Sequence, residues 1–135
     1  MDGNTTVFRV DGAPAPQGSK RHVGNGILVE SSAATLKPWR ERIAWTAREH
    51  HVPLHDGPVL VRLNFVMPRP RATPKRCTPA AVKRPDLDKL IRSVLDALTH
   101  IAWTDDSRVV SLHATKRLAE IAETPGLAIV IEELP

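Results

Sequence analysis

The sequence predicts an α/β protein of the α+β kind, in which a small mixed β-sheet packs against two main helices. Residues 59–67 alternate between two sets of side chains, which is typical of a strand with one buried face. Residues 31–50 and 85–100 each place apolar side chains three and four positions apart, as amphipathic helices do. The chain has 135 residues, which is enough for one domain, 1–135, with its own core.

The N-terminal part predicts a strand, a loop and a hairpin. Residues 5–10 are rich in β-branched and aromatic side chains and predict a strand. The prolines and glycines of residues 11–18 then indicate an extended loop. Asn25-Gly26 is typical of a two-residue turn, so we expect short strands near 20–24 and 27–30.

Each predicted helix has a start signal and an apolar stripe. Ser31 or Ser32 can cap the first, which runs to about His50. The second begins at Pro85 and Asp86, where a missing N–H and a negative charge are favoured, and ends near residue 100. The stripes are Leu36, Trp39, Ile43 and Ala47 in the first helix, and Leu87, Leu90, Ile91, Val94, Leu95 and Leu98 in the second.

Two further strands and one long loop complete the prediction. We expect strands at about 107–116 and 126–132, and the apolar run 127–131 suits a well-covered position in the sheet. Residues 68–85 contain five prolines among basic and small residues. This composition predicts a mobile basic loop rather than a helix or strand.

The net charge of +4 is unevenly distributed along the chain. Residues 69–84 contain six Lys or Arg and no acidic residue, whereas residues 118–135 contain four Glu and no Lys or Arg. Such separation favours a polyanionic partner at one region of the surface. On charge alone, a solvated loop whose cations keep the chain soluble explains the pattern equally well.

Two acidic pairs flank the second helix. Asp86 and Asp88 lie at its start, and Asp105 and Asp106 precede the next strand. Mg²⁺ prefers carboxylate, water and phosphate oxygens, so a fold that joins the pairs would create a site for phosphate chemistry. Each pair also has a structural explanation, because acidic residues are common at helix starts and in turns. Asp96, in mid-helix, is more simply a surface residue or part of a local ion pair.

Taken together, the motifs of this region resemble the RusA family of Holliday junction resolvases. The first motif is Arg84-Pro85-Asp86-Leu87-Asp88-Lys89-Leu90, and the helix that follows closes with Asp96-Ala97-Leu98. The last motif is Trp103-Thr104-Asp105-Asp106-Ser107-Arg108-Val109. Residues 8–21 also resemble that family's opening strand and glycine-proline loop. The segments occur in the expected order and cover most of the chain, and their combination is specific although no single motif is.

The resemblance implies a RusA-like single domain with a defined chemistry. Members of the family are small homodimers that bind four-way DNA junctions and resolve them by paired symmetric nicks, using Mg²⁺, for which Mn²⁺ can substitute. Such an endonuclease would serve recombination, repair or phage DNA processing. By position, Asp86, Asp88 and Asp106 would hold the metal, and Asp105 is a secondary candidate. Arg92 stands where the family usually has a catalytic lysine; it keeps the charge but cannot give up its proton.

The resemblance and the charge pattern together predict which basic residues bind DNA. Contacts to backbone phosphates position DNA without reading its bases, and they weaken steeply with salt. The expected contacts are Lys20, Arg21, Arg69, Arg71, Lys75, Arg76, Lys83, Arg84 and Lys89.

Two alternative functions stay open at this point. A non-catalytic protein that binds branched or single-stranded DNA would share the basic residues, but it would gain nothing from the acidic set. A small Mg²⁺-dependent nucleotide hydrolase would leave the basic loop unexplained. Because the sequence also lacks a Gly-rich phosphate loop, we expect no nucleotide cofactor.

The sequence disfavours membrane and secreted proteins. No apolar run approaches the roughly 20 residues of a transmembrane helix, so we expect no membrane partner. The N-terminus lacks the pattern of a signal peptide. Cys77 is the only cysteine, which excludes an intramolecular disulfide framework and makes the reducing cytoplasm the expected location.

Overall fold

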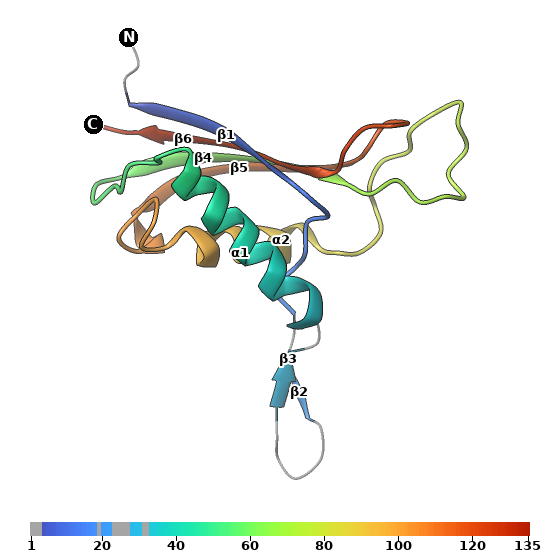
Figure 1. Ribbon diagram of the computed structural model, residues 1–135, viewed down its shortest axis with the longest axis horizontal. Helices are drawn as coiled ribbons and strands as arrows, with labels where there is room; N and C mark the ends of the chain where they lie inside the picture. Colours follow the sequence, from blue (N-terminus) through green and yellow to red (C-terminus); the bar gives the residue numbers. More distant parts are fainter. Residues whose placement is uncertain (1–3, 19, 23–27, 31–32) are drawn as a thin grey trace.

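A four-stranded sheet and two helices form two layers in the computed structural model of the protein (Figure 1). The strands of this sheet are β1 (Thr5–Asp11), β4 (Val59–Met67), β5 (Val109–Leu118) and β6 (Gly126–Glu133). The helices are α1 (Ala33–Glu49) and α2 (Leu87–Leu98). The structure describes residues 4–18, 20–22, 28–30 and 33–135.

The sheet is mixed, with the strand order β1-β6-β4-β5. β6 pairs antiparallel with both β1 and β4, whereas β4 and β5 are parallel. The parallel pair requires a crossover connection, and α2 lies within the segment that makes it. The predicted α+β class, with a mixed sheet packed against two main helices, is therefore confirmed.

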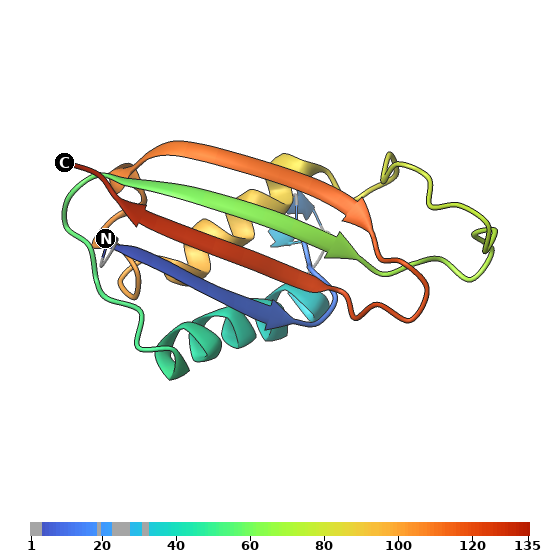
Figure 2. The same cartoon turned by 90° about the horizontal axis from the view of Figure 1, so that it is seen from above.

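The alternation along each strand explains why both helices cover the same face. Strand pairing brings Phe8, Ile129 and Leu63 side by side, and all three are buried beneath the helices. Seen from above, α1 runs along the β1 side of the sheet, while α2 crosses beneath its middle (Figure 2). Burial of each large apolar side chain contributes roughly 1.5–3 kcal/mol, so this shared core fixes the position of α2 in the molecule.

The remaining elements lie outside the two layers. A small antiparallel pair, β2 (Lys20–His22) and β3 (Leu28–Glu30), projects away from the sheet (Figure 1). The turn expected at Asn25-Gly26 and the cap expected at Ser31 or Ser32 lie outside the described residues.

Residues 68–85 contain no helix or strand and extend beyond the end of the sheet in both views (Figures 1 and 2). The strand expected from residue 107 begins instead at Val109, because Asp106–Arg108 form a short 3-10 helix, η1. In the described part of the chain, no helix combines the length and the apolar character needed to cross a membrane.

Candidate active site

Asp86 occupies the N-cap position of α2 without using its side chain as a cap. Its backbone is extended, with φ −69° and ψ 142°, and its carboxylate makes no capping hydrogen bond. The helix accepts this because the Asp86 carbonyl still receives the Leu90 N–H at 3.2 Å. An N-cap aspartate usually bonds the N–H groups of the first turn, so this exposed carboxylate retains its acceptor capacity for a ligand.

A hollow of about 640 Å³ opens beside Asp86. The loop 13–18 forms one wall, and Arg84 and Lys89 contribute cationic side chains to the other. The backbone N–H of Gln17 donates to the Lys89 carbonyl at 2.9 Å and so holds the loop against α2. Two cationic side chains beside a carboxylate, in an open hollow, are suited to binding a phosphate group together with a metal cation.

Farther along α2, the exposed face presents Asp88, Arg92 and Asp96 at successive helical turns. A guanidinium nitrogen of Arg92 lies 3.0 Å from a carboxylate oxygen of Asp106 and 3.7 Å from one of Asp96. Arg92 therefore joins the helix to the segment that follows it. This contact places the second acidic motif against α2, one helical turn beyond Asp88.

Asp105 and Asp106 have different surroundings although they are neighbours. Asp105 caps η1, and its carboxylate accepts the Ser107 N–H at 2.9 Å. Hydrogen bonds from the Ser107 side chain and backbone lower the pKa of Asp105. The Asp105 carboxylate thus serves the local turn, whereas Asp106 directs its carboxylate to Arg92 on α2.

Asp56 is a supporting residue that the sequence analysis missed. Its side chain accepts a hydrogen bond from Thr104 at 2.7 Å, and Arg108 donates to its backbone carbonyl at 2.7 Å. The hydrogen bond from Thr104, followed by the hydrogen bond and charge of Arg108, lowers the pKa of Asp56. These contacts fasten both ends of the Asp105-Asp106 turn to the segment before β4. No local pattern around residue 56 signals this long-range role.

The aspartates have the right chemistry for Mg²⁺, but their side chains are not gathered around one point. Carboxylate oxygens are the ligands that this hard cation prefers. Among the described residues, however, no three His, Cys, Asp or Glu side chains form a group that could hold a metal ion. One reason is visible, because the Arg92 guanidinium lies against the Asp106 carboxylate. Joining Asp86, Asp88 and Asp106 around one ion requires that side chain to move.

The residues expected to bind DNA fall into several groups. Lys20 and Arg21 belong to β2, and Arg84 and Lys89 line the hollow beside Asp86. Arg69 has a different role: it donates to Thr78 and to the carbonyls of Pro74, Cys77 and Ala119, at distances of 2.7 to 3.2 Å. Four further basic residues of the loop, Arg71, Lys75, Arg76 and Lys83, are exposed. The Arg69 side chain thus stabilises the loop through hydrogen bonds, whereas the other four side chains face solvent.

The end of the basic loop is also fixed in place. The Lys116 ammonium on β5 donates to the carbonyls of Lys83 and Pro85 at 3.0 and 2.8 Å. These bonds hold the chain just before it enters α2. The position of Asp86 therefore depends on β5 as well as on the helix that follows it.

Comparisons with known proteins identify this chain as a nuclease. A family model described as endodeoxyribonuclease RusA matches residues 11–132. The chain belongs to the RusA family, as the motifs around Asp86 and Asp106 predicted. It is also 30% identical to "Uncharacterized protein YqaN" of Bacillus subtilis (strain 168), over an alignment that covers 94% of this chain and 95% of that protein.

Proposed function

We propose that the protein is a Mg²⁺-dependent, structure-selective endonuclease that resolves four-way DNA junctions by paired symmetric nicks. The observation that carries the proposal is the uncapped Asp86 carboxylate, which lines a hollow together with Arg84 and Lys89. Membership of an endodeoxyribonuclease family supports hydrolysis of DNA. The lone cysteine, the exposed Cys77, suits a protein that acts in the reducing cytoplasm, in recombination, repair or phage DNA processing.

In this proposal, Asp86, Asp88 and Asp106 hold the metal ion, and Mn²⁺ can replace Mg²⁺. Once bound, the ion supplies the Lewis acidity that activates water and offsets charge on the phosphate. Arg84 and Lys89 bind the phosphates beside the scissile bond. Arg92 leaves Asp106 and turns its guanidinium toward the phosphate, where it offsets the charge that develops in the transition state. Arginine cannot serve as the general acid here, because it does not release its proton at ordinary pH.

In this proposal, the protein selects junctions because it acts as a homodimer. A four-way junction has approximate two-fold symmetry, so a two-fold dimer would place one active site on each of two matching strands. The basic residues of the loop (Arg71, Lys75, Arg76 and Lys83) would hold the arms through their phosphates. Such contacts do not read bases, so the shape of the dimer must select the branch.

The proposal is tested with a labelled four-way junction and a linear duplex of the same sequence, each incubated with Mg²⁺ or EDTA. We expect symmetric nicks in the junction alone, which require Mg²⁺ and disappear in Asp86→Asn. Asp11→Asn is the matched control, because Asp11 is an exposed aspartate on β1 that pairs with Arg9 outside the site. Equal cleavage of duplex and junction would keep the nuclease and remove the resolvase assignment.

The second candidate is a protein that binds branched or single-stranded DNA without cutting it. It is favoured by one observation: the described carboxylates do not form a ready metal group, and Arg92 neutralises Asp106. Tight binding of the junction with no Mg²⁺- or Mn²⁺-dependent product would establish this candidate instead. The two functions differ in the effect of Asp86→Asn, which would leave a pure binder unchanged or strengthen its binding by removing a negative charge.

A further inference from the structure

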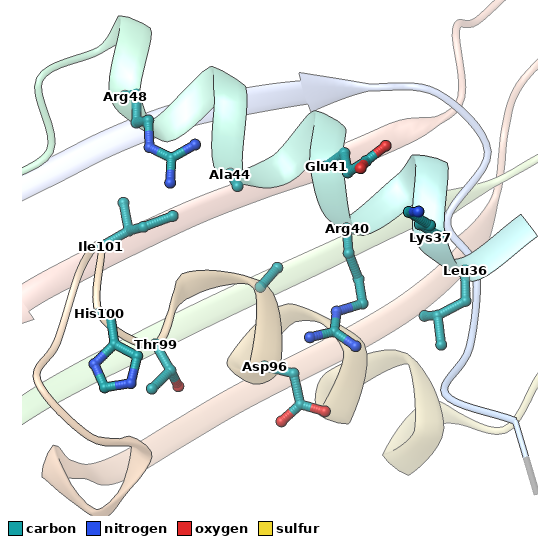
Figure 3. Close-up of a pocket in the computed structure, with 11 residues that line it drawn as sticks. Leu36, Lys37, Arg40, Glu41, Ala44, Arg48, Asp96, Thr99, His100 and Ile101 are labelled. Atoms are coloured by element: carbon teal, nitrogen blue, oxygen red, sulfur yellow. The ribbon is translucent and has the colours of Figure 1, made fainter. Parts of the chain in front are cut away.

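A second hollow, of about 630 Å³, lies between α1 and α2, away from the one beside Asp86. We call it the inter-helix groove and define it by Lys37, Arg40, Ala44 and Arg48 of α1, by Asp96 of α2, and by His100 just after that helix. Figure 3 shows Arg40 and Arg48 pointing from α1 into the space between the helices. The DNA-binding residues expected from the sequence include none of these.

The helical repeat explains why the cations share one face of α1. Positions 37, 40, 44 and 48 are separated by three or four residues, so their side chains point in similar directions. The neighbouring face consists of the buried side chains that anchor α1 to the sheet. At 1.5 Å per residue, the stretch from 37 to 48 spans roughly 16 Å along α1.

The groove has an excess of positive charge and room for a ligand. Three cations (Lys37, Arg40 and Arg48) and two carboxylates (Glu41 and Asp96) line it, and Asp96 also lies 3.7 Å from Arg92. Ala44 on α1 and Ala97 on α2 keep the centre of the groove open, since neither has a long side chain.

The cations of the groove differ from those that stabilise the fold. Arg69, Arg108 and Arg117 each donate to protein oxygens within the fold. The side chains of Lys37 and Arg48 are exposed, and neither forms a hydrogen bond or ion pair with the residues that the structure describes. These charges are therefore available to an external anion.

The groove adjoins the candidate active site through α2. Asp96 lines the groove, and Arg92, one helical turn before it, contacts both Asp96 and Asp106. A polyanion in the groove would thus pass roughly two helical turns from Asp88, with Arg92 and its partner Asp106 between them. We propose that the inter-helix groove binds the sugar-phosphate backbone of a DNA strand next to the scissile phosphate. This inference rests on the proposed nuclease function and extends its DNA-binding surface to α1.

The test is binding of the four-way junction in EDTA, measured by fluorescence anisotropy at several salt concentrations. The variant combines Lys37→Ala, Arg40→Ala and Arg48→Ala. Loss of three phosphate contacts should reduce the slope of log affinity against log salt by about 2.7, so affinity should change about 40-fold less between 50 and 200 mM salt. With Mg²⁺ present, the variant should show a raised KM for the junction and an unchanged kcat.

The matched control is Arg62→Ala, because Arg62 is exposed on the sheet face that the helices leave uncovered. It should bind with the wild-type slope. Arg40→Lys should recover most of the contribution of Arg40, since a phosphate contact needs the charge. Circular dichroism and thermal melting establish that each variant is folded.

Three outcomes would overturn the inference, and they can be told apart. If the wild-type protein cuts the junction but the triple variant keeps its full salt slope, the groove does not bind DNA and the proposed function stands. If the variant instead changes only the oligomeric state in light scattering, the groove is a contact between subunits. If the wild-type protein neither binds nor cuts the junction, the proposed function fails and the inference fails with it.

Discussion

Arg92 is expected to compete with metal binding and yet to assist catalysis. Its guanidinium lies 3.0 Å from Asp106, so a cation that binds Asp106 must displace it. Replacing Arg92 with alanine removes the competitor and should strengthen metal binding. The same change removes a positive charge from the site of the developing transition state and should slow cleavage.

The expected gain in metal affinity can be estimated from the solvent exposure of the Arg92–Asp106 ion pair. The side chains of Arg92 and Asp106 are 52% and 38% exposed, so solvent screens their attraction. Exposed ion pairs contribute about 0.2–1 kcal/mol, which corresponds to a gain of about 1.4-fold to 5-fold in metal affinity. Loss of one transition-state contact typically lowers kcat about 100-fold to 1000-fold.

The assay titrates Mn²⁺ into DNA-free protein and follows binding by calorimetry, while cleavage is measured separately at saturating metal. Arg92→Ala should move the two quantities in opposite directions, and Arg62→Ala should move neither. Arg92→Lys keeps the positive charge, so it should retain much of the cleavage rate. Metal affinity that is equal or lower in Arg92→Ala would refute the idea that the Arg92–Asp106 pair opposes metal binding.

Three further predictions concern the structure around the site. Two hydrogen bonds of 2.7 Å from Arg117, and then one from the Glu120 backbone N–H, lower the pKa of Glu123 from 4.5 to about 2. The stabilisation from these contacts is present above pH 4.5 and is lost as the pH falls toward 2. Arg117→Gln should therefore raise that pKa toward 4.5 in a carbon-13 NMR titration, and an unchanged value would contradict the assignment. Arg69→Ala should lower the melting temperature, whereas Arg71→Ala should reduce the salt dependence of DNA binding without changing stability; the reverse pattern would assign Arg69 to DNA. Leu63→Ala should cost about 2–5 kcal/mol of unfolding free energy in urea titrations, because the side chain is fully buried, and a cost below about 1 kcal/mol would mean that the site collapses freely.

Most of the fold could be predicted because its signals are periodic. The alternation of residues 59–67 and the apolar stripe of the second helix reflect which side chains the core buries. The structure buries Leu90, Val94 and Leu98 and partly buries the rest of the stripe, and it also buries Val66, on the other face of its strand. The boundaries predicted for the end of α2 and the start of β5 were less accurate. The 3-10 turn at 106–108 is held by local hydrogen bonds of Asp105, which periodicity does not report.

The contacts within the candidate site could not be predicted, because they join residues that are far apart in sequence. The sequence marks Asp86 and Asp106 as chemically suitable, but it does not show that Arg92 lies between the two acidic motifs. It also does not show that the Arg69 side chain, predicted as a DNA contact, donates to carbonyls of its own loop. In the sequence, the cations of the inter-helix groove have the spacing of an ordinary solvated helix face. Only the structure shows that α2 lies opposite them.

One hydrogen bond described above affects how the N-terminal loop can evolve. The bond from Gln17 to the Lys89 carbonyl joins two backbones, so every amino acid except proline can supply the donor at position 17. The side chain at position 17 can therefore change while this wall of the hollow keeps its place beside Asp86. The protein can in this way change the lining of its site without rebuilding the frame around it.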